Sequence, residues 1–318
     1  MWYVSSSPHI HSGDTVSKNM LSVLVALIPA CIVALYYYGL GMLMVTTVSV
    51  VSCVAVEWAI QKYLMRKTST INDGSAILTG VLLALNLPSN LPVWIVIVGA
   101  IAAIGIGKMP FGGLGNNIFN PALVGRIFLL ISFPAQMTTW PVPGFFPMDY
   151  TDAETGATLL TVLQSGGATA LPQGVGSLLS GDMGGSLGLA GGVAMIGGLC
   201  YMLVRKTITW HIPLSVMAST ILFTGVMHAV DPTQYISPLI HLFSGGLLLG
   251  AIFMATDYVT SPMTPVGMLV YGAGIGLLTA IIRLFGAYPE GMAFAILIMN
   301  ACTPLINTYT KPKHFGGC

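Results

Sequence analysis

Long, continuous runs of apolar residues recur along this chain, and they constrain its fold more than any other feature. They do not show the alternating pattern of membrane β-strands, and many approach the length of about 20 residues that a helix needs to cross a bilayer. Only 7% of the 318 residues are charged, whereas soluble domains contain about 25%. A soluble surface cannot be built from this composition, so the sequence predicts an all-α, polytopic membrane protein.

The charge balance and hydrophobicity exclude two other classes of protein. The 11 basic and 10 acidic residues leave no strongly positive surface of the kind that binds nucleic acid. A hydrophobic content of 55% excludes an intrinsically disordered chain. The five cysteines and six histidines lack the spacing of zinc or iron–sulfur ligands, so no metal site is predicted.

Ten helical spans are predicted, and the third and fifth are short for a bilayer. Short segments interrupted by Gly and Pro are typical of tilted or discontinuous helices. The predicted spans are residues 20–41, 43–64, 74–88, 92–109, 117–133, 187–204, 210–229, 237–255, 265–284 and 291–308.

The basic residues predict which ends of the spans face the cytoplasm. Nine of the eleven would lie on one side, and only Arg126 and Arg283 fall inside spans or at their ends. Because cytoplasmic loops are rich in Lys and Arg, both termini are expected in the cytoplasm. Residues 127–204 contain no Lys or Arg, which places the long loop 134–186 outside.

A weak internal similarity favours two inverted repeats of five helices. Residues 78–83 resemble residues 243–248, and residues 120–123 faintly resemble residues 300–305. Such repeats are typical of transporters with broken helices near the midplane. Small residues at helix-packing positions would give the same similarity by chance. The predicted domains are residues 1–133, the loop 134–186 and residues 187–318.

The predicted outer loop contains the seven residues DAETGAT, which end at Thr158. Taken alone, they form a polar turn that leads into an apolar segment, with Thr158 near a helix start. The segment resembles the flavinylation motif D-x-x-[S/T]-G-A-T of the NqrB/RnfD family, in which the last threonine receives FMN through a phosphoester bond. The resemblance implies covalent FMN on Thr158, installed by a flavin transferase that recognises Asp152, Thr155, Gly156 and Ala157.

Three further segments resemble landmarks of the same family. They are residues 7–9 (SPH), 115–122 (GNNIFNPA) and 255–262 (ATDYVTSP). Because these landmarks extend from the N-terminus to the eighth predicted span, the resemblance covers essentially the whole chain. The length and the short N-terminal region are more similar to the RnfD branch than to the longer NqrB branch.

The resemblance implies a flavoprotein subunit of an Rnf-type complex in the bacterial inner membrane. Such a complex couples electron transfer between reduced ferredoxin and NAD to translocation of Na⁺ or H⁺. This chain would relay electrons through its covalent FMN, with RnfA, RnfB, RnfC, RnfE and RnfG as partners and little activity alone. The resemblance also allows a second, noncovalently bound flavin such as riboflavin.

Two alternatives to this function stay open. Inverted repeats and broken helices are also typical of a channel or secondary transporter without redox activity. A subunit of the NqrB type, which passes electrons to quinone, would carry the same flavinylation motif. A flavin attached to the purified chain would distinguish the redox interpretations from a plain transporter.

Several charged residues are predicted at membrane depth, where an unpaired ion is costly. Glu57 is interpreted as a paired carboxylate near the cytoplasmic face or as a residue of an ion path. Arg126 would neutralise the FMN phosphate or a helix C-terminus, or form a structural ion pair. Asp257 is expected to cap a helix or form a turn, and Asp73 to cap the third span.

The glycine-rich turn at residues 108–115 invites a nucleotide-loop interpretation, which fails. It lacks the third glycine of GxGxxG and follows a membrane span rather than a strand. A re-entrant turn that lines a polar cavity suits it better. Asn116, Asn117 and Asn120 would donate hydrogen bonds there or cap helices, and Asn120 joins Arg126 as a candidate flavin contact.

Overall fold

The computed structural model describes residues 15–66, 70–148, 150, 155–156, 187, 191–232, 234–286, 288 and 290–311. These residues are mostly helical, which confirms the predicted class. Five of their helices are long and apolar enough to cross a membrane, and they indicate a multi-pass membrane protein. The five are Val16–Leu64, Val93–Phe111, His211–Val230, Pro265–Phe285 and Met292–Tyr309.

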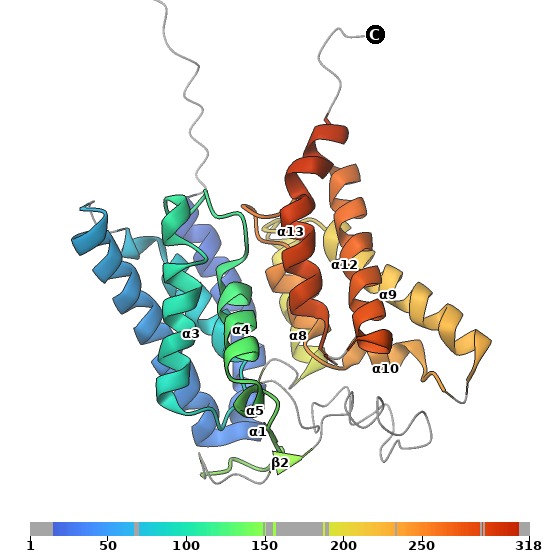
Figure 1. Cartoon of the computed structure of the whole chain (residues 1–318), viewed down its shortest axis with the longest axis horizontal. Coiled ribbons are helices and arrows are strands. Elements are labelled where there is room, and N and C mark those ends of the chain that lie inside the picture. Colours follow the sequence, from blue (N-terminus) through green and yellow to red (C-terminus); the bar gives the residue numbers. More distant parts are fainter. Residues whose placement is uncertain are drawn as a thin grey trace, which may run out of the picture.

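Two groups of helices lie side by side, coloured blue to green and yellow to red in Figure 1. The first group is α1 (Val16–Ala59), α2 (Ser75–Leu85), α3 (Val93–Gly105), α4 (Pro121–Ser132) and α5 (Pro134–Met137). The second is α8 (Gly192–Val204), α9 (His211–Val230), α10 (Pro238–Phe243), α11 (Leu247–Leu249), α12 (Pro265–Phe285) and α13 (Met292–Tyr309).

Within the first group α1 packs against α2 and α3, and α4 packs against both of these. Within the second group α12 packs against α9 and α13. The two groups contact each other where α8 packs against α1 and α13 packs against α4.

Short helical turns and one strand pair complete the described structure. Single 3-10 turns occur at Ile71–Asp73 and Met109–Phe111, and π-helical turns at Ile60–Leu64 and Gly250–Met254. The antiparallel strands β1 (Trp140–Pro141) and β2 (Thr155–Gly156) pair Trp140 with Gly156 and Pro141 with Thr155.

The helix α1 breaks at Gly39, close to the predicted boundary between the first two spans. With its π-helical extension this segment is 49 residues long, more than twice the length of about 20 residues that one crossing needs. Gly39 has φ +50° and ψ −127°, a conformation that favours glycine. A Cβ at this position would collide with the backbone of Pro147, so the chain can bend here only because the residue is glycine.

Replacing Gly39 by Ala should therefore destabilise the protein by about 1–3 kcal/mol, through strain at positive φ and loss of the close approach. Thermal unfolding of the purified protein measures this. The control is Gly197→Ala in α8, where an added Cβ meets no atom of the described residues within 4 Å and a helical alanine should be neutral or stabilising. Equal stability of the two variants would contradict the account of the break.

The predicted eighth span, residues 237–255, is wrong as a continuous helix. It ends at Phe243, resumes at Leu247 and passes into a π-helical turn from Gly250 to Met254. Gly245 and Gly246 both adopt positive φ, of 55° and 51°, which an α-helix cannot contain. Residues 78–83, which resemble this segment in sequence, lie within the unbroken α2.

The third and fifth predicted spans are short in the structure, as expected from their sequences. α2 has 11 residues and α4 has 12. α4 begins where the Asn120 side chain accepts a hydrogen bond from Ala122 N–H, with Pro121 in the first turn. The first residues of both helices, Ser75 and Pro121, line one pocket together with Lys108, and this pocket is the candidate site.

Candidate functional site

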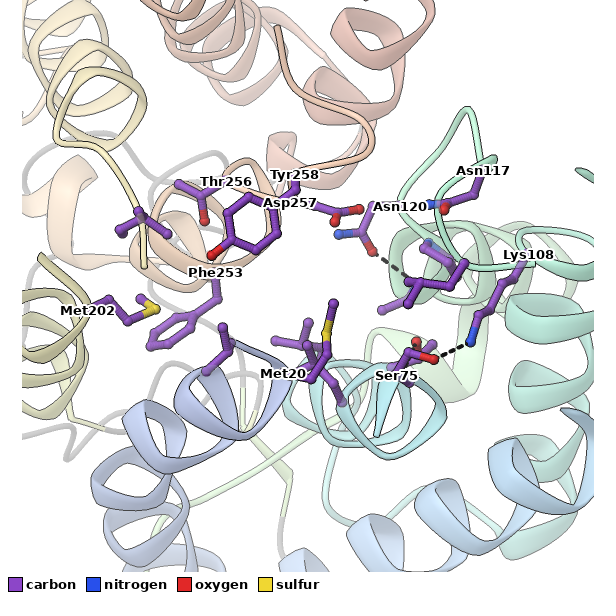
Figure 2. A pocket seen from close by; sticks show the side chains of 18 residues that line it. Met20, Ser75, Lys108, Asn117, Asn120, Met202, Phe253, Thr256, Asp257 and Tyr258 are labelled. Carbon is purple, nitrogen blue, oxygen red and sulfur yellow. Dashed lines mark hydrogen bonds between the residues drawn. The ribbon is translucent and has the colours of Figure 1, made fainter. Parts of the chain in front are cut away.

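A mainly apolar pocket with several polar side chains in its lining lies between the two groups of helices, next to the start of α2 and α4 (Figure 2). It encloses about 60 Å³, room for a few water molecules. The first group contributes Ser75, Lys108 and Asn120, and the second contributes Phe253, Thr256 and Asp257. The glycine-rich turn at residues 108–115 lines this pocket through Lys108 and Leu114, and Asn117 follows it, but the lining of the pocket is mainly apolar rather than polar.

Lys108, which lines the pocket, belongs to a buried ion pair. Lys108 Nζ lies 2.7 Å from Glu57 Oε2, and the two residues are each 1% exposed. Lys108 also donates a hydrogen bond of 2.6 Å to Ser75 Oγ. Glu57 is thus a paired carboxylate, the first of its two interpretations from sequence, and its charge is compensated within the chain.

Polar side chains extend this pair toward the surface. Ser75 Oγ donates a 2.6 Å hydrogen bond to Asp73 Oδ1, which also accepts from Ser75 N–H; the N-cap position of α2 itself is Gly74. On the other side Gln61 Nε2 donates to Glu57 Oε1 at 3.2 Å and to Thr70 Oγ1 at 2.8 Å. Buried charges are stable when every lone pair and proton is satisfied in this way, so the network fixes the pocket wall.

Asp257 lies on the connection between Met254 and α12 and lines the pocket. Asn117, which precedes α4, lines it as well. The pKa of this carboxyl is raised above its ordinary value because the group is buried. Hydrogen bonds from Val259 N–H, Thr260 and Asn117 and the nearby charge of Lys108 offset part of this rise. Asn117 Oδ1 is buried and has no hydrogen-bond partner among the described residues. Asn117 Oδ1 is therefore an acceptor in the pocket lining that a small polar ligand or water could satisfy.

Asn120 joins the two groups of helices at the pocket. Besides capping α4, its side-chain nitrogen donates a hydrogen bond of 3.2 Å to the carbonyl of Met254. Its backbone N–H lies 3.2 Å from the side-chain oxygen of Asn300 when that amide is turned to satisfy its neighbours. The two residues that mark the faint internal similarity thus meet in space.

Arg126 and Arg283, the two basic residues outside the predicted cytoplasmic cluster, are both buried inside the fold. Arg126 donates a 2.5 Å hydrogen bond to Asn86 Oδ1 and forms an ion pair with Glu290, which links α4 to the turn before α13. Arg283 donates to three backbone carbonyls at the break after α10, at 2.6, 2.9 and 2.7 Å. Both charges have partners within this chain, so neither belongs to a loop that sets membrane orientation.

The structure describes part of the predicted flavinylation motif. Thr155 and Gly156 form β2, whose partner strand β1 begins at the buried Trp140, shortly after α4 and α5. β2 lies at the opposite end of the helices from the end of α13 (Figure 1). Thr158, Asp152 and Ala157 lie outside the described residues.

A family model for the NQR2, RnfD, RnfE family matches residues 3–316. The chain belongs to this family. Among curated relatives, the D subunit of the Na⁺-translocating ferredoxin:NAD⁺ oxidoreductase complex of Acetobacterium woodii is 44% identical over 315 residues, which cover 98% of this chain and 95% of the relative.

Two other relatives match this NQR2, RnfD, RnfE family member over nearly their whole lengths. The D subunit of the proton-translocating ferredoxin:NAD⁺ oxidoreductase complex of Clostridium ljungdahlii is 39% identical, over 98% of this chain and 96% of the relative. The D subunit of the ion-translocating oxidoreductase complex of Actinobacillus succinogenes is 38% identical, over 99% and 98%. The first two relatives are named for different ions, so resemblance to them does not identify the ion.

Sequence reasoning missed several buried polar residues of this family member. The charge pattern treats Lys108 as a cytoplasmic residue at the end of the fourth predicted span, and no motif singles out Asn86, Glu290 or Tyr271. In the structure Tyr271 Oη pairs with Asn300 at 2.5 Å, and Asn86 accepts from Arg126. The signal that could have found them is a polar residue within a long apolar run, which at membrane depth points to a partner.

Proposed function

We propose that this chain is the D subunit of an ion-translocating ferredoxin:NAD⁺ oxidoreductase complex in the bacterial inner membrane. The observation that carries this proposal is the 44% identity to a subunit of that name over 98% of the chain. The similarity extends over the complete membrane region, so the assignment does not depend on one shared motif. Within the complex, the subunit relays electrons and contributes to the membrane part.

The electron carrier in this proposal is FMN, joined to Thr158 by a phosphoester bond. The seven residues ending at Thr158 match every specified position of the flavinylation motif. A threonine hydroxyl is the group that such a bond requires, and the paired strands β1 and β2 attach the neighbouring residues to the helical body. When bound, FMN accepts and donates one or two electrons, and the protein sets its properties by hydrogen bonds, charge and burial.

The proposed topology has ten crossings, with both termini in the cytoplasm and the motif outside. Its support is the distribution of positive charge at the ends of the helices. Lys62 and Arg205 lie at helix ends away from β2, and residues 127–204, which include β2, contain no Lys or Arg. The buried partners of Arg126 and Arg283 remove the two exceptions from this count.

The pocket residues have a separate role in the proposal. Asn120 and the Arg126–Glu290 pair hold the two groups of helices together, so that Lys108 of the first group and Asp257 of the second line the same pocket. With a volume of about 60 Å³, the pocket accepts water or a small cation. A second, noncovalent flavin such as riboflavin would fit there only if the lining side chains moved apart.

The partners in this proposal are the other Rnf subunits, RnfA, RnfB, RnfC, RnfE and RnfG, together with the flavin transferase during maturation. The test is a strain that lacks only this chain. Its membranes should lose NAD⁺ reduction by reduced ferredoxin, and the chain supplied in trans should restore it. Unchanged NAD⁺ reduction in the deletion strain would contradict the assignment, as would purification of the tagged chain without other subunits.

A further inference from the structure

A short segment at the end of the molecule near β1 closes the break in α1. Residues 144–148, here called the strap, cross the helix beside Gly39. Gly144 N–H donates to the carbonyl of Tyr37 at 3.0 Å, and Phe146 N–H donates to the carbonyl of Tyr36 at 2.9 Å. In return the N–H of Leu40 donates to the carbonyl of Pro147 at 3.1 Å. The strap thus satisfies backbone groups that the break leaves without helical partners.

The backbone of the strap is held in one conformation. Phe146 has φ +43°, which is strained for a residue with a side chain. Such strain persists only where the surroundings determine the conformation. Here they do so through three hydrogen bonds and through Gly39, which has no Cβ to obstruct Pro147. The strap is therefore an ordered segment whose conformation is determined by its contacts with α1.

The side chains of this rigid strap point away from the protein and are apolar. Phe145 is 80% exposed and Met148 is 75% exposed. The strap sequence GFFPM contains no charged or hydrogen-bonding side chain. In water this arrangement would expose apolar area that a small change of rotamer could not bury, so a different environment must cover it.

The strap continues a lipid-facing stripe of α1. Leu21, Ile28, Ile32 and Tyr36 are spaced by seven and four residues and are 60%, 50%, 61% and 49% exposed, so they form one apolar face of the first half of α1. Phe145 packs edge-on against Tyr36, with ring centroids 5.2 Å apart and an interplanar angle of 87°. The exposed surface of the strap is thereby continuous with a surface that faces the bilayer.

From this continuity we infer that the strap is an interfacial membrane anchor, with Phe145 and Met148 inserted among the lipids of the leaflet at that end. Trp and Tyr are enriched at this depth of a bilayer, and Tyr36 is the residue against which Phe145 packs. The anchor would fix the height of the adjoining strands β1 and β2 above the membrane, because β1 ends only three residues before Gly144. The inference depends on the fold alone and would hold even if the chain carried no FMN.

Photo-crosslinking in the intact complex in native membranes tests the inference. The photoreactive analogue p-benzoylphenylalanine is placed at position 145 or 148, where the exposure of the native side chain leaves room for it. Two matched positions provide controls: Ile32 on the same stripe should react with lipid, and Gln234, an exposed polar residue in the α9–α10 connection, should not. After irradiation, mass spectrometry separates phospholipid adducts from crosslinks to protein.

The expected result is phospholipid adducts at positions 145 and 148, with a yield close to that at position 32 and several-fold above that at position 234. A crosslink to another subunit as the main product would show that protein covers the strap, and would overturn the inference. A lipid yield no higher than at position 234 would place the strap in water and would also overturn it.

Discussion

Replacing Thr158 by Val should remove covalent FMN from this subunit and abolish NAD⁺ reduction by reduced ferredoxin in membranes that contain the complex. Valine has nearly the shape of threonine but no hydroxyl, so the phosphoester bond cannot form. The band of the chain in a denaturing gel should lose its flavin fluorescence under ultraviolet light. Because the change is conservative, the amount of assembled complex should stay the same.

A second threonine in the same segment provides the control. Thr161→Val alters the same type of side chain three residues later and should keep both the fluorescence and the activity. Persisting fluorescence in the Thr158→Val chain would overturn the assignment of the attachment residue. Loss of fluorescence with full activity would instead show that the flavin is attached but lies outside the electron route.

Replacing Lys108 by Met should destabilise the subunit by about 3–5 kcal/mol, since it leaves the carboxylate of Glu57 buried without its partner. Lys108 Nζ lies 2.7 Å from Glu57 Oε2, and both side chains are buried. The loss of Lys108 also removes the donor to Ser75 Oγ. A lowered midpoint of thermal unfolding and a lower yield of assembled complex measure the effect.

The double variant Glu57→Gln with Lys108→Met separates pairing from packing. Removing both charges leaves no buried ion, so the double variant should be more stable than Lys108→Met alone. If the losses of the two single variants simply added, the pair would contribute no coupling, and the structural account of the pocket wall would be wrong.

The sequence predicted the helices well because their signals are local. Apolar runs of helical length, Asn120 before Pro121, and Thr264 before Pro265 mark helix positions without reference to the rest of the chain. The predicted boundary between the first two helices lies within a few residues of Gly39. The position of the break in the eighth span was not predicted, since glycine is also common in continuous membrane helices. The contacts that stabilise the break come from Arg283 in a distant helix, which donates to the carbonyls of Ser244 and Gly245.

The site was harder to predict because its contacts join residues far apart in the chain. Lys108 and Glu57 are 51 positions apart, and Arg126 and Glu290 are 164 apart. A single sequence indicates that a buried charge needs a partner but does not identify which residue supplies it. The motif around Thr158 is different, because it is identified by resemblance to a family and does not depend on contacts between distant residues.

The most direct test of the proposed function is mass spectrometry of the proteolytic peptide that contains Thr158, taken from complex purified from its native membrane. Fragmentation should locate a mass increase equal to FMN less one water on Thr158, and the Thr158→Val peptide should be unmodified. An unmodified Thr158 peptide from active complex, or FMN located on another residue, would contradict the account.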